Sequence, residues 1–177
     1  MEIKSLLESL LFVADRPVTV ENLATALEVS SEEVESALQA LQEEYQARGI
    51  RLQYKGERIQ LVSAPEAGPY IERFLGLEIS GRLSSAALEA LSIVAYRQPV
   101  TRAQVEAIRG VNSDSVLRSL VRRGLLEELG RAETVGRPIL YGTTFEFLQQ
   151  FGLTSLQELP DWQVLEQELR EREAARG

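Results

Sequence analysis

The chain has 177 residues and a formal net charge of −8, with 19 Lys and Arg against 27 Asp and Glu. Its length allows one ordinary domain or two small ones, and 44% apolar with 26% charged residues is typical of a globular protein. There is no Cys and no His, which excludes disulfides, thiolate chemistry, Cys-based metal sites and acid–base catalysis by histidine. No run of about 18 apolar residues is present, so no membrane-spanning helix is expected.

The first 80 residues predict three helices followed by a β-hairpin. Leucines at helical spacing mark a first helix that ends before Pro17, and Thr19 can cap a short second one. A capping box at Ser30 and Glu33 opens a third helix over residues 31–48. Residues 50–54 and 58–61 then alternate between apolar and polar around a glycine turn, which is typical of a hairpin. A short helix over residues 65–75 completes this half.

The second half predicts the same order of elements. A helix over residues 84–97 ends before Pro99, and a capping box at Thr101 and Gln104 opens the next, with Val105 and Ile108 facing inward. Asn112 caps a third helix, and strands at 125–129 and 139–141 form a second hairpin. A further capping box, Thr143 with Glu146, predicts a last short helix.

The two halves align at a constant offset of 82 residues, which indicates an internal repeat. Pro17-Val18-Thr19 falls on Pro99-Val100-Thr101, and Val34 falls on Val116. We therefore predict an α+β, mainly α fold of two tandem winged-helix domains, each a helix-turn-helix with a β-hairpin wing, plus a short C-terminal tail. The predicted ranges are 1–79, 80–160 and an acidic tail over 161–177, with a hinge between Gly76 and Leu83. In the tail, Trp162, Leu165 and Leu169 share one helical stripe, which fits either a docking helix or a frayed end.

The charge distribution bears on DNA binding. Residues 1–80 carry a net charge of −7, residues 81–152 one of +2 and residues 153–177 one of −3. The helix at 31–48 exposes five glutamates, which would repel phosphates, so the first domain is not expected to bind DNA. The corresponding helix at 113–123 carries Arg118, Arg122 and Arg123. These arginines can lie on a solvated face or pair with Glu89, Glu106, Glu127 and Glu128, bind an acidic protein segment, or contact DNA.

Four stretches of the second half carry a resemblance to a known family. They are Gly130–Thr144 (GRAETVGRPILYGTT), 83–91 with 95–102, Ile108–Asp114 (IRGVNSD), and 147–153 with 156–160. Together with the opening Leu-Leu-Phe-Val-Ala they resemble segregation-and-condensation protein B (ScpB), over nearly the whole chain up to Pro160. Ser115 stands where the family often has Gly, and the tail after Pro160 lies outside the resemblance.

The resemblance implies a function for the chain. ScpB-like proteins are non-enzymatic pairs of winged-helix domains that form homodimers mainly through the N-terminal domains. They bind ScpA, the kleisin that bridges the ATPase heads of the bacterial SMC protein, and the complex takes part in chromosome segregation and condensation during cell division. A cytoplasmic, nucleoid-associated protein without a cofactor or metal is therefore expected, in contact with the SMC heads through ScpA and with DNA only indirectly, and not with a membrane.

Candidate contact residues follow from this hypothesis. The partner-binding candidates in the family-like half are Arg97, Arg109, Arg118, Arg123, Arg131, Arg137 and Tyr141. The dimer-interface candidates in the first domain are Leu41, Tyr45 and Tyr54.

Two alternative functions stay open. One is a winged-helix transcription regulator that contacts DNA through residues 113–123. The other is an enzyme that uses carboxylates alone, for which the adjacent Glu127 and Glu128 are poorly placed because neighbouring strand residues face opposite ways.

Overall fold

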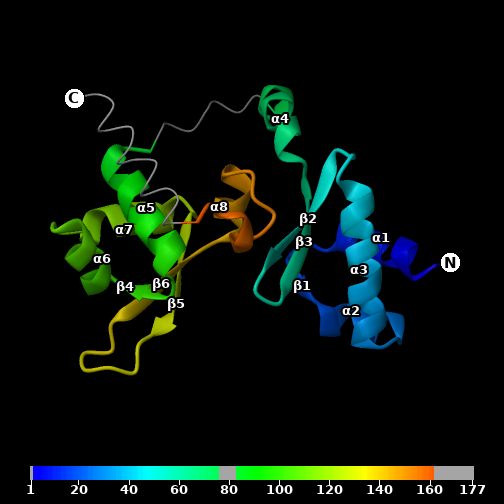
Figure 1. The fold of residues 1–177 in the computed structure, drawn as a ribbon, viewed down its shortest axis with the longest axis horizontal. Coiled ribbons are helices and arrows are strands. Elements are labelled where there is room, and N and C mark those ends of the chain that lie inside the picture. Colours follow the sequence, from blue (N-terminus) through cyan, green and yellow to red (C-terminus); the bar gives the residue numbers. More distant parts are fainter. Residues whose placement is uncertain (1, 76–82, 162–177) are drawn as a thin grey trace. The chain divides into compact units, whose positions relative to one another are not determined.

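The computed structural model describes residues 2–75 and 83–161. The chain divides into two compact units. The first unit comprises residues 1–82 together with 145–155, and the second comprises residues 83–144 together with 156–177. Both mix helices with short strands and are mainly helical (Figure 1). The predicted hinge at 76–83 and the predicted stripe of Trp162, Leu165 and Leu169 lie almost entirely outside the described residues.

The helices of the first unit begin where the sequence places caps. They are α1 (Ile3–Val13), α2 (Val20–Leu27) and α3 (Ser31–Tyr45). Thr19 caps α2 in a reciprocal box with Asn22, and Ser30 caps α3 with Glu33, as predicted for Ser30. Helix α3 ends at Tyr45, three residues earlier than predicted. Their apolar faces meet in one core formed by Leu7, Leu11, Leu23, Val34, Leu38, Leu41 and Tyr45.

A three-stranded sheet covers this core. The strands are β1 (Val18–Thr19), β2 (Ile50–Lys55) and β3 (Arg58–Ser63), in the order β1-β3-β2 with antiparallel pairing. The predicted hairpin is therefore confirmed, with Gly56 at its turn in the left-handed region at φ 57°. Leu52 and Ile59 place their side chains in the core. The 3₁₀ turn η1 (Pro65–Ala67) and helix α4 (Gly68–Leu75) follow.

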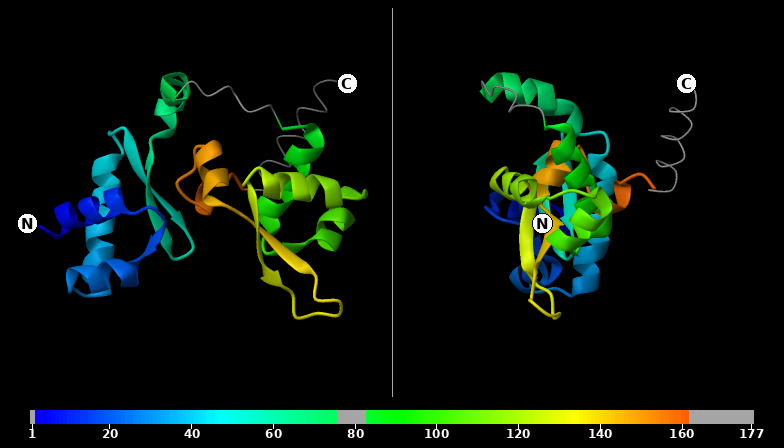
Figure 2. Two further views of the ribbon diagram at one scale, coloured as in Figure 1. Left: turned by 180° about the vertical axis from the view of Figure 1, so that it is seen from behind. Right: turned by 90° about the vertical axis from the view of Figure 1, so that its left-hand side faces the viewer.

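One segment of the first unit comes from far along the chain. Helix α8 (Phe145–Gln150) and the residues after it contact β2, beside which they lie (Figures 1 and 2). This differs from the predicted division of the chain, in which residues 145–155 were part of the second domain. The predicted boundary between residues 79 and 80 falls in a part that the structure does not describe. The prediction that residues 1–79 and 80–160 fold as independent domains stays a prediction.

The second unit has the element order of the first. It contains α5 (Ser85–Arg97), β4 (Val100–Thr101), α6 (Arg102–Arg109), α7 (Asp114–Arg122), β5 (Leu126–Arg131) and β6 (Ile139–Thr143), then the 3₁₀ turn η2 (Leu156–Glu158). Its sheet order β4-β6-β5 matches β1-β3-β2, and Thr101 caps α6 as Thr19 caps α2. Figure 2 shows the β5–β6 hairpin extending beyond helices α5 to α7. The internal repeat predicted from the offset of 82 residues is thus seen in the elements.

Three local predictions in the second half are wrong or need correction. Ile108 was predicted to face inward but is 56% exposed, whereas Val105 is fully buried. Thr143 was predicted to form a capping box with Glu146. In the structure Thr143 is the last residue of β6, and its backbone N–H donates to the side-chain oxygen of Gln98. Asn112 accepts the backbone N–H of Asp114, and the residue directly before α7 is Ser113. At Thr143, a contact from another element decides what the local pattern leaves open.

Candidate protein-binding surfaces

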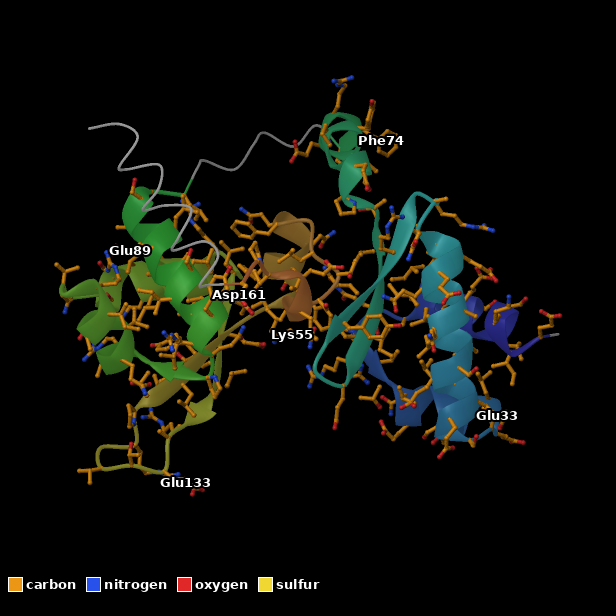
Figure 3. All side chains as sticks on the ribbon, viewed as in Figure 1. Glu33, Lys55, Phe74, Glu89, Glu133 and Asp161 are labelled. Carbon is orange, nitrogen blue, oxygen red and sulfur yellow. The ribbon has the colours of Figure 1, made fainter. Side chains whose placement is uncertain are left out.

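Arg109, a predicted contact residue, is engaged inside the second unit. Its Nε lies 3.0 Å from Glu89 Oε2 on α5, and its Nη1 donates to Ser113 Oγ at 2.8 Å. Only 6% of its side chain is exposed, while Glu89 projects from α5 (Figure 3). Arg109 therefore joins α5 to the start of α7, which is a structural role, and this corrects its prediction as a surface contact.

The same chain of contacts continues across α6 and α7. Glu106 accepts the backbone N–H of Ser113 at 2.9 Å, and Arg102 Nη1 lies 2.9 Å from Asp114 Oδ1. The hydrogen bond to Asp114, followed by the charge of Glu106, raises the pKa of Arg102. Arg118, another predicted contact, lies 3.0 Å from the second oxygen of Asp114. Much of the positive charge near α7 is therefore matched by carboxylates of the same unit.

The β5–β6 hairpin presents a different surface. Arg131 and Arg137 are exposed and lie together, because Arg131 Nη1 donates to the backbone carbonyl of Arg137 at 3.0 Å. Leu129 is 50% exposed and Val135 is fully exposed on the same hairpin, whose tip carries Glu133 (Figure 3). We call Leu129, Arg131, Val135 and Arg137 the hairpin surface. Apolar side chains beside arginines are the composition that protein interfaces favour.

The apolar members of the hairpin surface were missed by sequence reasoning. Alternation from the buried Leu126 places Leu129 on the opposite face of the strand, and this outward leucine was not singled out as a contact residue. The pairing register shifts between Glu128 and Gly130, which marks a β-bulge, and Gly130 has a φ of 132°. The glycine after Leu129 was the available signal for this bulge.

The remaining predicted contacts of the second unit are scattered. Tyr141 lies on the central strand β6, opposite Val100 and Glu128, and is only 8% exposed. Burial, and then the negative charge of Glu128, raises the pKa of its phenol. Arg97 is exposed at the end of α5, and Arg123 is exposed just after α7. Of the seven predicted residues, the structure brings only Arg131 and Arg137 together on an open surface.

The predicted dimer-interface residues of the first unit are mostly internal. Leu41 and Tyr45 are each 1% exposed and belong to the core. The Tyr45 hydroxyl donates to Glu8 at 2.8 Å, and burial followed by this hydrogen bond raises the pKa of Tyr45. Their side chains are therefore core residues, which corrects the prediction for both. Tyr54 is half-buried on β2, where burial raises the pKa of its phenol.

Other apolar side chains of the first unit face outward. On α4, Tyr70, Phe74 and Leu75 are 70%, 87% and 57% exposed, and Phe74 projects from the edge of the unit (Figure 3). We call these three residues the α4 face. Phe12 and Val13 at the end of α1 are exposed as well. The spacing of four residues between Tyr70 and Phe74 was the sequence signal for this face.

Other kinds of site can be assessed within residues 2–75 and 83–161. In these ranges no three acidic side chains are grouped so that they could hold a metal ion. None of the helices described there is long and apolar enough to cross a membrane. Glu127 and Glu128 pair with Gly142 and Tyr141, respectively, so their side chains leave the strand on opposite faces, as predicted.

Comparison with known proteins gives consistent matches. The family model described as segregation and condensation complex subunit ScpB matches residues 5–162. The segregation and condensation protein B of Desulforamulus reducens is 49% identical over 159 residues, which are 89% of this chain and 87% of that protein. The protein of the same description from Clostridium botulinum strain Kyoto is 42% identical over 172 residues, covering 96% and 89% of the two chains.

Solved structures of similar proteins were also found. The crystal structure of ScpB from Mycobacterium tuberculosis is 42% identical, covers 86% of this chain and 96% of that one, and has a TM-score of 0.42. A dimer of an ScpB N-terminal domain complexed with a ScpA peptide is 30% identical, covers 40% of this chain and 91% of that one, and has a TM-score of 0.38.

Proposed function

The chain belongs to the ScpB family of segregation and condensation complex subunits, and on that premise we propose that it is a protein-binding subunit without catalytic activity. Its partner is the kleisin ScpA, through which it contacts the SMC ATPase heads of a condensin-like complex. In this role it takes part in chromosome segregation and condensation during cell division. It works in the cytoplasm and meets the nucleoid through the complex.

Each unit is, in this proposal, a winged-helix domain. The order of helix, two-residue strand, two further helices and a β-hairpin supports this interpretation in both units. So does the pairing of the two-residue strand with the second strand of the hairpin, which is β1 with β3 in one unit and β4 with β6 in the other. The wings are then the β2–β3 and β5–β6 hairpins.

The observation that carries the proposal is the contrast between paired and open arginines in the second unit. Arg109 and Arg118 contact carboxylates of their own unit, whereas Arg131 and Arg137 stand on the same hairpin as the exposed Leu129 and Val135. Burial of the apolar pair against a ScpA segment supplies affinity, and the two guanidinium groups at the rim select an acidic or carbonyl-rich partner and set its register.

The first unit supports the homodimer. Leu41 and Tyr45 are core residues, so the available apolar surface lies on the α4 face and at the end of α1. Because a helix of eight residues is marginally stable without packing, α4 gains from being covered in the assembly. The proposal that the first unit forms the dimer comes from the family, and these exposed side chains support it.

DNA binding by this chain alone is not favoured. Helix α3 exposes Glu32, Glu33 and Glu35 in its first half, where it would approach phosphates. On α7, Asp114 holds both Arg102 and Arg118, which reduces the charge available to a phosphate backbone. Contact with DNA therefore arises through the complex.

Capture of the organism's own ScpA by the purified chain tests this function. The double variant Arg131→Ala with Arg137→Ala should weaken capture at least tenfold while its melting temperature stays near that of the wild type. Arg122→Ala, which removes an exposed arginine of α7 in the same unit, is the matched control and should retain capture. Absence of wild-type capture, or equal losses in both variants, would contradict the proposal, and sequence-selective retardation of duplex DNA by the lone chain would favour a transcription regulator.

A further inference from the structure

Each unit has one long strand at an edge of its sheet. In the first unit, with the order β1-β3-β2, the edge strands are β1, which has two residues, and β2, which has six. In the second unit, with the order β4-β6-β5, they are β4, which has two residues, and β5, which has six. An edge strand presents unpaired N–H and C=O groups that can pair with a strand of another chain. Because a two-residue edge offers little to pair with, β2 and β5 are the strands that need protection.

The two long edges are protected in different ways. β5 has a bulge between Glu128 and Gly130 and carries Glu127, Glu128 and Arg131, and both bulges and charges discourage pairing. β2 pairs with β3 in six consecutive positions without a register shift, from Ile50 opposite Ser63 to Lys55 opposite Arg58. A regular strand of this kind would be an effective template if its outer side were open.

Residues 153 and 154 occupy the outer side of β2. The backbone N–H of Tyr54 donates to the carbonyl of Thr154 at 2.7 Å. The side-chain amide of Gln53 donates to the carbonyl of Leu153 at 2.8 Å, and its oxygen accepts from Gln60 at 2.8 Å. Gln53 is only 1% exposed although it is a polar residue. The segment therefore satisfies both a backbone donor at the edge and a buried amide.

The rest of residues 145–155 anchors this contact. Phe147 and Leu148 of α8 are 3% and 0% exposed, so the helix is held by its apolar side. Gly152 turns the chain with a φ of 67°, and a Cβ at this position would lie 3.2 Å from Pro65 Cβ in η1. Gly152 thus permits a close approach of the segment to the first unit.

We propose that residues 145–155 form a detachable segment that covers the β2 edge of the sheet in the first unit, and we call this segment the guard. Closed, the segment occupies the outer side of β2 and prevents copies of the chain from pairing edge to edge. The segment is held by Phe147 and Leu148 of one short helix and, at β2, by two carbonyls, so we expect it to open more readily than the core, and opening bares Tyr54 and Gln53. This inference depends on the contacts within the first unit and is independent of the function proposed above.

Hydrogen exchange in the full chain tests the guard. Gly152→Val places a side chain against Pro65 and strains the backbone, so the amides of Tyr54 and of residues 145–155 should exchange at least tenfold faster, with α3 and α5 unchanged. The matched control is Gly136→Val, which has a similar φ of 82° but no atom within 4 Å of its Cβ, and which should leave the amide of Tyr54 unaffected. The Gly152 variant should also form concentration-dependent assemblies larger than those of the wild type in sedimentation velocity. Unchanged exchange at Tyr54, or equal acceleration across α3 and α5, overturns the proposal.

Discussion

The Nε of Arg109 lies 3.0 Å from the carboxylate of Glu89, and the Arg109 side chain is 6% exposed although it comes from the end of a helix rich in polar residues. With its second bond to Ser113, this guanidinium links three helices of the second unit. An arginine that the sequence presents as a surface contact is thus part of the interior.

Arg109→Ala should lower the free energy of unfolding by about 2 kcal/mol, because hydrogen bonds that involve a charged group contribute about 1.5–3 kcal/mol and the hydroxyl of Ser113 loses a partner. Urea unfolding of the full chain measures this loss. Arg97→Ala, at an exposed position on α5, is the control and should stay within about 0.5 kcal/mol of the wild type. Weaker ScpA capture by Arg109→Ala without a loss of stability would contradict the structural role.

Leu41→Ala should cost about 2–5 kcal/mol, since it leaves a cavity in the core of the first unit. Tyr45→Phe keeps the ring and removes only the hydrogen bond to Glu8, for which about 1 kcal/mol is expected. Thermal and urea unfolding give both values. If Leu41→Ala instead dissociated a dimer and kept the stability of the unit, residue 41 would belong to an interface after all.

Gly142→Ala should destabilise the second unit by about 1–2 kcal/mol through overpacking. The new Cβ would lie 2.6 Å from Leu129 Cδ1 and 3.0 Å from Gln98 Oε1, and the Gln98 oxygen is fixed because it accepts the N–H of Thr143. Adding Leu129→Ala removes the nearer obstacle, so the double variant should be more stable than the sum of the single changes predicts. Strict additivity in urea unfolding would exclude Leu129 as the obstacle.

Glu33→Gln should reduce the acid sensitivity of the first unit. Hydrogen bonds from the backbone and then the hydroxyl of Ser30 hold the pKa of Glu33 below its ordinary value. A carboxylate whose pKa is lowered by folding stabilises the fold fully above its unfolded pKa of about 4.3, and this contribution disappears as the pH falls through the lower folded value. The difference in melting temperature between wild type and Glu33→Gln should therefore shrink from pH 7 to pH 3. Glu32→Gln, outside the capping box, should show no such convergence.

Local features of this fold were predictable because they depend on neighbours in sequence. The cap at Ser30 and the box of Thr101 with Gln104 form as expected, since each satisfies backbone donors within four residues. The hairpin around Gly56 forms because alternation and a turn residue agree. The same local rules gave wrong predictions for Thr143 and Ile108. The side-chain oxygen of Gln98 accepts the backbone N–H of Thr143, and no described element covers Ile108.

By itself, the sequence determined the succession of helices and hairpins and the repeat at 82 residues, which follow from spacing along the chain. It also carries the motifs by which the chain matches its family. Only the tertiary structure decided which arginines are already paired, that Leu41 and Tyr45 lie inside, and that residues 153 and 154 complete the edge of β2. The physical reason is that charge pairing and burial depend on distances between elements far apart in sequence. The amide of Gln53 and the carbonyl of Leu153 are 100 positions apart, and no local pattern encodes their contact.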